Sequence, residues 1–178
     1  MVKRIAAKTK NKLDYKYDLL RKAIDYAFDI HQGQYRADDK TPYIIHPLNV
    51  MVDVMQFSYN MNVWMAAVLH DTLEDSDQKN KVYVDIEQNF GIEVANIVYI
   101  LTRRKDIDET YDDYIERIVF TKNYDAMLIK LCDISHNLKT LNDIPCITEK
   151  ERFEKQLRYA EASKYLMSEF KKQCDIEQ

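Results

Sequence analysis

Two glycines, Gly33 and Gly91, are the most restrictive feature of this sequence of 178 residues. Sandwiches, barrels and doubly wound sheets need many turns with a positive φ, and glycine adopts this conformation most easily. With so few glycines the chain also lacks the Gly-rich loops that hold phosphates in P-loop and dinucleotide-binding proteins. The sequence therefore predicts an all-α fold.

Apolar residues recur at helical spacing along most of the chain. The first expected helix runs from about residue 14 to residue 31, and a loop from Gly33 to Pro42 follows it. Pro47 is placed as in the first turn of a helix that extends to about Phe57. Further helices are expected after a cap at Asn60 or Asn62, before Gly91, at residues 92–102, after Thr110, at residues 126–141 and at residues 149–170.

Local signals mark three of the expected helix ends. Thr110-x-x-Asp113 and Thr148-x-x-Glu151 both have the capping-box pattern, which satisfies free backbone amides at a helix N-terminus. Gly91 is a typical residue just beyond a helix C-terminus. No repeat or linker divides the chain, so we expect a single domain at residues 14–172 after a short basic tail at residues 1–13.

Charge and cysteine usage narrow the class of protein further. A formal net charge of −4 does not suit a general nucleic-acid binder. The longest apolar run, residues 63–69, is far shorter than the roughly 20 residues of a membrane span. Three cysteines form an odd number without metal-type spacing, which indicates free thiols in a reducing compartment. We therefore expect a cytoplasmic protein without a nucleic-acid or membrane partner.

Polar residues interrupt two strongly apolar stretches. His70 and Asp71 follow the apolar residues of AAVLHDTLEDS, and Asp133 follows those of MLIKLCDISHN. Burying an imidazole or a carboxylate costs several kcal/mol unless another group compensates for it, and a divalent metal would do so. Histidine and aspartate together suit manganese, iron or zinc with positions left for water. Such a site would lower the pKa of bound water.

Helix geometry places a second set of carboxylates near the first. His70 and Glu74 are i,i+4 neighbours, as are Asp71 and Asp75. One pair would then bind metal while the other orients or deprotonates the attacking water. Asn137 stands one helical turn after the aspartate of IKLCD and would reach a ligand over the same metal.

Each residue also has a competing structural interpretation. A buried histidine is commonly a hydrogen-bonded core residue, and Glu74 with Asp75 would serve equally well as a solvated pair at a helix end. Taken singly, these interpretations are at least as good as the functional ones. The combination favours the metal site.

The motifs TPYIIHP, AAVLHDTLEDS and IKLCDISHNL resemble the successive motifs of the HD-domain metal phosphohydrolases. The segments HQGQYR, FG and LTRR make the RelA/SpoT-type alarmone hydrolase branch the most similar one. The resemblance extends over roughly residues 20–165. It implies a helical bundle of about eight or more helices around a central metal site.

The resemblance also implies roles for individual residues. The metal, usually manganese and one ion per chain, would be held by His46, His70, Asp71 and Asp133. Glu74 and Asp75 match the pair that places and activates the nucleophilic water, while Arg36, Asn137 and Tyr159 match nucleotide-contacting residues. The implied reaction removes the 3′-pyrophosphate from guanosine tetra- or pentaphosphate, which leaves GDP or GTP.

Several residues differ from the family pattern or have no assigned role in it. Cys132 and Ile134-Ser135 replace the Ala and Arg-Leu of many members, and Asp38-Asp39 is expected to weaken polyphosphate binding. His31 and His136 are expected to support the site rather than bind metal. The segment Arg103–Lys105 is expected to be a solvated loop of mixed charge, with a phosphate clamp as the alternative.

Three functional hypotheses follow. The first is a manganese-dependent alarmone 3′-pyrophosphohydrolase acting on a small nucleotide. The second is an HD phosphohydrolase of another nucleotide, such as a deoxynucleoside monophosphate or NADPH. The third is a non-catalytic nucleotide sensor, which has no need of Glu74 and Asp75 beside a metal.

Overall fold

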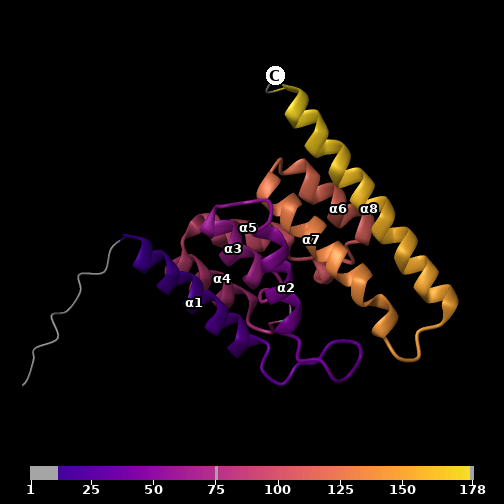
Figure 1. Ribbon diagram of the computed structural model, residues 1–178, viewed down its shortest axis with the longest axis horizontal. Coiled ribbons are helices and arrows are strands. Elements are labelled where there is room, and N and C mark those ends of the chain that lie inside the picture. The colour runs from indigo at the N-terminus through magenta and orange to yellow at the C-terminus, as the bar shows by residue number, and fades with distance from the viewer. Residues whose placement is uncertain (1–11, 75, 177–178) are drawn as a thin grey trace, which may run out of the picture.

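The computed structural model describes residues 12–74 and 76–176 and contains eight α-helices and two short 3-10 helices in them (Figure 1). This part of the chain has no β-strand, and its one β-bridge joins Tyr35 to Pro42. The prediction of an all-α fold is confirmed. Most of the expected basic tail at residues 1–13, together with Asp75, lies outside the described residues.

The elements follow one another as α1 (Lys12–Ile30), α2 (Ile45–Val54), α3 (Met61–Leu69), α4 (Lys79–Phe90), α5 (Ile92–Leu101), η1 (Lys105–Ile107), α6 (Tyr111–Phe120), α7 (Tyr124–Thr140), η2 (Leu141–Asp143) and α8 (Glu149–Ile176).

Helix α3 forms the centre of the bundle. Seven of its nine residues are buried, because its sequence MNVWMAAVL is apolar on nearly every side. It packs against α1, α2, α5 and α7. A helix that is apolar all round needs cover on all sides, and these four neighbours provide it. The residues that follow α3 are thereby fixed deep inside the molecule.

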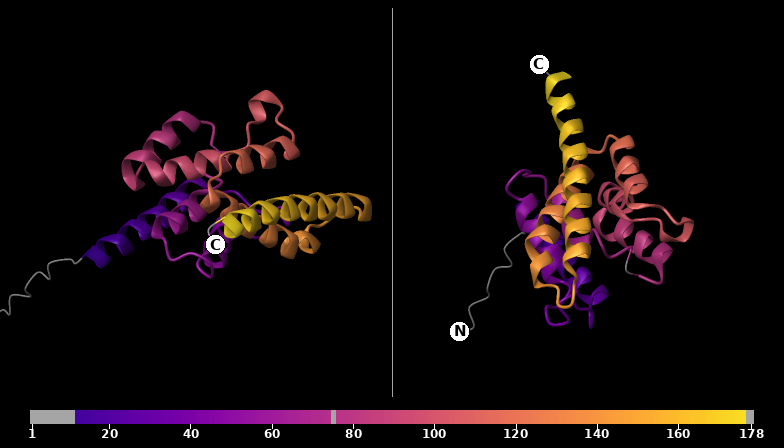
Figure 2. Two further views of the ribbon diagram at one scale, coloured as in Figure 1. Left: turned by 90° about the horizontal axis from the view of Figure 1, so that it is seen from above. Right: turned by 90° about the vertical axis from the view of Figure 1, so that its right-hand side faces the viewer.

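Helix α8 has the opposite character, because it is long and mostly polar. It lies against α6 and α7, and Ala162 and Leu166 are buried there. Its C-terminal part extends beyond the other helices (Figures 1 and 2). In the described part of the chain, no helix combines the length and the apolar character needed to cross a bilayer.

The expected capping residues begin three of the helices. Asn60 accepts a hydrogen bond from the amide of Asn62, and Thr110 forms a reciprocal capping box with Asp113. The side chain of Thr148 exchanges hydrogen bonds with Glu151 in the same way. These contacts explain why the helix starts were the most predictable boundaries.

Two helix ends differ from the sequence prediction. Helix α2 ends at Val54 rather than near Phe57, because the chain tightens into a turn in which the amide of Phe57 donates to the carbonyl of Val54 at 3.0 Å. Helix α8 continues past Phe170 to Ile176, and no glycine or proline follows residue 170 to stop it.

Candidate metal centre and its cavity

Three parts of the fold bring the predicted metal ligands together. His46 lies in the first turn of α2, His70 caps the C-terminus of α3 with Asp71 directly after it, and Asp133 lies within α7. Helix α2 packs against both α3 and α7. The four side chains therefore meet where these helices contact one another, although up to 87 positions separate them in the sequence, from His46 to Asp133.

The possible ligand atoms converge on one point. One such atom each from His46, His70 and Asp71 lies within 4.8 Å of the other two. Nε2 of His46 is 3.1 Å from Oδ1 of Asp133 and 3.5 Å from Oδ2 of Asp71. Nε2 of His70 is 3.2 Å from the same Asp71 oxygen and 3.9 Å from Asp133. Two imidazole nitrogens and two carboxylates facing one point form a donor set suited to a divalent metal.

His70 provides the clearest indication that this donor set fits a cation. Its Nδ1 lies 2.8 Å from the carbonyl oxygen of Ala67, which accepts a hydrogen bond, so Nδ1 carries a proton and points away from the cluster. Nε2 is buried and has no hydrogen-bond partner among the described residues. Burial alone would lower the pKa of His70, but the carboxylate of Asp71 raises it to about 9. The cluster thus favours a positive charge at this point.

His136 contacts the predicted ligand His46 through its imidazole ring. The Nδ1 atoms of the two rings are 2.8 Å apart, so one of them carries a proton that bonds the other. Burial, with the nearby charges of His46 and Arg36, lowers the pKa of His136 to about 4. A hydrogen bond of this kind fixes the orientation of a metal-binding histidine.

The predicted substrate contacts join the same cluster through hydrogen bonds. The guanidinium of Arg36 donates to Oδ1 of Asn137 at 2.7 Å, and Nδ2 of Asn137 donates to Oδ1 of Asp133 at 2.6 Å. Arg36 also lies over the ring of Tyr43, whose hydroxyl donates to Oδ2 of Asp71 at 2.8 Å. Tyr43 was not singled out in the sequence, although it stands in the motif TPYIIHP.

The carboxylate of Glu74 is held by the segment that follows α5. The backbone amide of Arg103 donates to Oε2 at 3.0 Å, and Nζ of Lys105 lies 2.8 Å from Oε1. Glu74 nonetheless lines the same cavity as Asp71 and Asp133. Its proposed partner Asp75 lies outside the described residues.

A cavity of about 290 Å³ opens beside the cluster. Five basic side chains line it: Arg36, Arg103, Lys130, Lys155 and Arg158. Tyr159, a predicted nucleotide contact, lines it as well, and its ring lies 6.1 Å from that of Tyr111. The hydroxyl of Tyr111 is buried without a hydrogen-bond partner in the described part of the chain. The cavity is therefore suited to an anionic ligand with an aromatic group.

Lys130 is a buried charged residue of this site that sequence reasoning missed, as it missed Lys155 and Arg158. The stretch MLIKLC was interpreted as a buried helix, and its single lysine was passed over. Nζ of Lys130 lies 2.8 Å from Oδ2 of Asp133 and 4.8 Å from the centre of the Tyr114 ring. Burial would lower the pKa of Lys130, but Asp133 holds it well above the ordinary value. The i,i+3 spacing to Asp133 was the available signal.

The segment Arg103–Lys105 is exposed at Arg104 and Lys105, as its mixed charge predicted, but it is also held by hydrogen bonds. The guanidinium of Arg103 donates to the carbonyl of Glu109, and the amide of Arg104 donates to the Glu109 carboxylate. That carboxylate is buried and paired with Arg117 at 2.6 Å. Arg104 and Lys105 are solvent-exposed as expected, and contacts with Glu74 and Glu109 additionally fix the position of the segment.

Asp38 has a local structural role. Its carboxylate accepts hydrogen bonds from the amides of Lys40 and Thr41 and from the Thr41 hydroxyl. These bonds, that from the hydroxyl first, lower the pKa of Asp38 to about 2. The Asp38 carboxylate therefore stabilises the turn at residues 38–41.

Comparisons with known proteins show the family to which this chain belongs. Residues 23–160 match the HD domain family. The guanosine-3′,5′-bis(diphosphate) 3′-pyrophosphohydrolases of Aquifex aeolicus and Borreliella burgdorferi are 35% and 31% identical over 68% and 70% of this chain. The bifunctional (p)ppGpp synthase/hydrolase SpoT of Escherichia coli is 33% identical over 70%. The chain spans 18–19% of the length of these three relatives.

A solved structure shares the whole fold. It is described as a metazoan ortholog of SpoT that hydrolyzes ppGpp, and it matches with a TM-score of 0.69 at 24% identity. The match covers 94% of this chain and 98% of the other. The family model covers residues 23–160, and the chain therefore belongs to the HD domain family.

Proposed function

We propose that this chain is a metal-dependent 3′-pyrophosphohydrolase of guanosine 3′,5′-bis(diphosphate). Water would attack the phosphorus attached to the 3′ oxygen, that P–O bond would break, and GDP and pyrophosphate would result. The observation that carries the proposal is the convergence of His46, His70, Asp71 and Asp133 beside Glu74. The names of the relatives support the choice of substrate.

His46, His70, Asp71 and Asp133 would hold the metal, for which we propose Mn²⁺. When bound, such a metal supplies Lewis-acid polarisation of a phosphate oxygen and a lower pKa for the attacking water. Nε2 of His70, which has no hydrogen-bond partner among the described residues, supports this assignment.

The surrounding residues would do the remaining work. Glu74 would accept the proton of the attacking water, and we propose that Asp75 assists in the same step. Arg36 would bind a phosphate through charge-assisted hydrogen bonds, with Asn137 orienting its guanidinium at 2.7 Å. Tyr159, at the α8 side of the cavity, would contact the nucleoside.

We also propose that the reaction takes place in the cytoplasm. Cys132 and Cys146 are free thiols, one buried and one exposed. An exposed free thiol is typical of proteins in a reducing compartment.

A nucleotide screen with Mn²⁺ and chromatographic identification of the products tests the proposal. Guanosine tetraphosphate is expected to be the preferred substrate and to give GDP with intact pyrophosphate. Release of orthophosphate, or preference for a deoxynucleoside monophosphate or NADPH, would instead indicate another HD phosphohydrolase. Tight nucleotide binding with no turnover of any substrate would indicate a sensor.

A further inference from the structure

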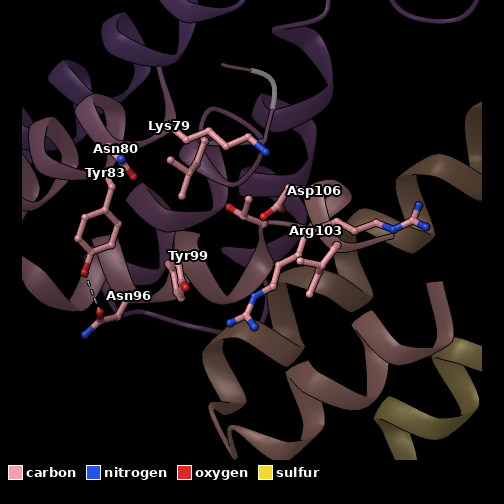
Figure 3. A pocket seen from close by; sticks show the side chains of 11 residues that line it. Lys79, Asn80, Tyr83, Asn96, Tyr99, Arg103 and Asp106 are labelled. Carbon is pink, nitrogen blue, oxygen red and sulfur yellow. Dashed lines mark hydrogen bonds between the residues drawn. The ribbon is translucent and has the colours of Figure 1, made fainter. Parts of the chain in front are cut away.

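A second cavity, of about 590 Å³, lies between α4, α5 and the segment that follows α5 (Figure 3). Its polar lining includes Lys79, Tyr83, Asn96, Tyr99, Arg104 and Asp106. Of all its lining residues, Arg103 alone also lines the cavity beside the metal centre. The second cavity is therefore a separate space that shares one wall with the candidate active site.

The second cavity carries more positive than negative charge. Neither the ammonium of Lys79 nor the guanidinium of Arg104 has an ion-pair partner within the described ranges, and Asp106 is the one carboxylate in the lining. This excess stands out in a chain whose net charge is −4. A hollow with unpaired cations attracts an anion, and arginine suits phosphate in particular.

An aromatic platform lies beside these cations. The rings of Tyr83 and Tyr99 are 5.9 Å apart and meet edge to face, and the Tyr83 hydroxyl donates to Oδ1 of Asn96 at 3.2 Å. Arg104 lies over the Tyr99 ring, with 5.8 Å between its guanidinium carbon and the ring centre. Figure 3 shows Tyr83, Asn80 and Asn96 on one side of the cavity. Rings and amides together suit a planar base with polar edges.

Residues 103–106 form the wall between the two cavities, and they contact a different cavity on each face. On one face, the amide of Arg103 and the ammonium of Lys105 hold the Glu74 carboxylate at 3.0 and 2.8 Å. On the other face, Arg104 and Asp106 line the second cavity. Because these residues alternate along one short segment, a ligand that fixes Arg104 also fixes the groups that hold Glu74.

We propose that this second cavity is a regulatory site for a nucleoside phosphate. Its phosphates would bind Lys79 and Arg104, and its base would pack against Tyr99. Occupancy would keep Glu74 paired with Lys105 and so slow proton transfer. The proposed binding does not depend on the proposed function, whereas the effect on the hydrolysis rate rests on it.

Equilibrium dialysis with GTP and with ATP tests the binding. An Arg36→Ala background weakens nucleotide binding at the metal centre and leaves the second cavity intact. One nucleotide per chain is expected to remain bound there. Adding Arg104→Ala or Lys79→Ala is expected to weaken this binding roughly ten- to a hundredfold, as the loss of a charge-assisted hydrogen bond does.

Lys81→Ala is the matched control, since this exposed lysine of α4 lies outside the second cavity and its loss removes the same charge. It should leave the affinity unchanged. The proposal is overturned if Arg36→Ala abolishes all binding, which would mean one ligand spanning both cavities. Equal affinities in the Arg104→Ala and Lys81→Ala proteins would overturn it too.

Steady-state kinetics test the effect on Glu74. Nucleotide at the metal centre competes with substrate and raises KM, whereas nucleotide in the second cavity should lower kcat, by about fivefold or more for a typical coupling. Arg104→Ala should keep the basal kcat and lose this response. An unchanged kcat at saturating nucleotide would overturn the coupling. Absence of hydrolysis altogether would refute the proposed function, and dialysis would still decide the binding.

Discussion

At Glu74, a role in proton transfer can be tested separately from a role in holding the metal or the fold. Both of its oxygens are held by residues 103–105, yet the side chain still lines the metal cavity. Glu74→Gln keeps the shape and the hydrogen bond from the Arg103 amide but removes the proposed proton acceptor. We expect bound Mn²⁺ to be unchanged and kcat to fall about 10²–10⁴-fold. Elemental analysis and product-release assays on one preparation check this.

Asp77→Asn is the control for Glu74→Gln, because it removes an exposed carboxylate three residues further along the chain. It should leave both metal content and kcat near those of the wild type. Turnover close to wild type in Glu74→Gln would move the base elsewhere, with Asp75 next to be tested.

Lys130 neutralises a buried carboxylate, and the metal would share that task. Its ammonium lies 2.8 Å from Asp133, and both side chains are almost fully buried. Lys130→Met leaves the carboxylate without its partner, which in buried pairs costs about 3–5 kcal/mol. We expect the free energy of unfolding to fall by this amount with chelator present and by clearly less with Mn²⁺. Urea titrations under both conditions measure the difference.

Lys139→Met, on the same helix, is the matched control for Lys130→Met. Its ion pair with Asp53 is formed at 3.0 Å, but the lysine side chain is 61% exposed, so its loss should cost less than about 1 kcal/mol. Equal losses for the two variants, or a Lys130→Met loss that Mn²⁺ does not reduce, would contradict the role assigned to Lys130.

How well the sequence predicted each site residue depends on whether its signal is local or comes from a contact distant in the sequence. His70, Asp71 and Asp133 stood out in the sequence because polar residues break apolar stretches. Lys130 was hidden among such residues, although its partner is three positions away. The partners of Glu74 were out of reach, because Arg103 stands 29 positions further along and only the folded chain brings it near.

At the scale of the elements, Gly91 joins α4 to α5 with a backbone that other residues rarely adopt. Its φ of 94° and ψ of 160° lie in a region that is essentially restricted to glycine. A Cβ at this position would meet no atom within 4 Å, so the whole effect of Gly91→Ala should be backbone strain. We expect a loss of about 1–3 kcal/mol in the free energy of unfolding, measured by chemical denaturation.

Gln88→Ala, an exposed change in the last turn of α4, should alter stability by less than about 0.5 kcal/mol and serves as the control. A neutral Gly91→Ala would show that the α4–α5 connection relaxes. The sequence predicted this connection because a glycine after an apolar periodic stretch marks a helix end. It did not predict the end of α2, where ordinary residues continue into a turn.

At the scale of the whole molecule, the candidate metal centre ties distant parts of the chain together. His46 comes from α2, His70 and Asp71 from the end of α3, and Asp133 from α7. The acceptor atoms face one another at 3.1–3.9 Å, an arrangement that repels itself unless a cation or proton lies between them. Binding of metal to the folded state alone must therefore raise stability.

This linkage leads to a quantitative expectation for metal removal. A ligand at a thousand times its Kd stabilises the folded state by about 4 kcal/mol, which for a domain of this size shifts Tm by roughly 10 °C. Chelation should lower the Tm of the wild type by roughly this amount and leave the Tm of the Asp133→Ala protein unchanged. Asp53 pairs with Lys139 outside the cluster, so the Tm of the Asp53→Ala protein should fall on chelation as that of the wild type does. Differential scanning calorimetry with and without Mn²⁺ measures all three proteins. An identical Tm for the wild type in both conditions would mean that these four residues hold no metal, and the cluster would then be a protonated core network.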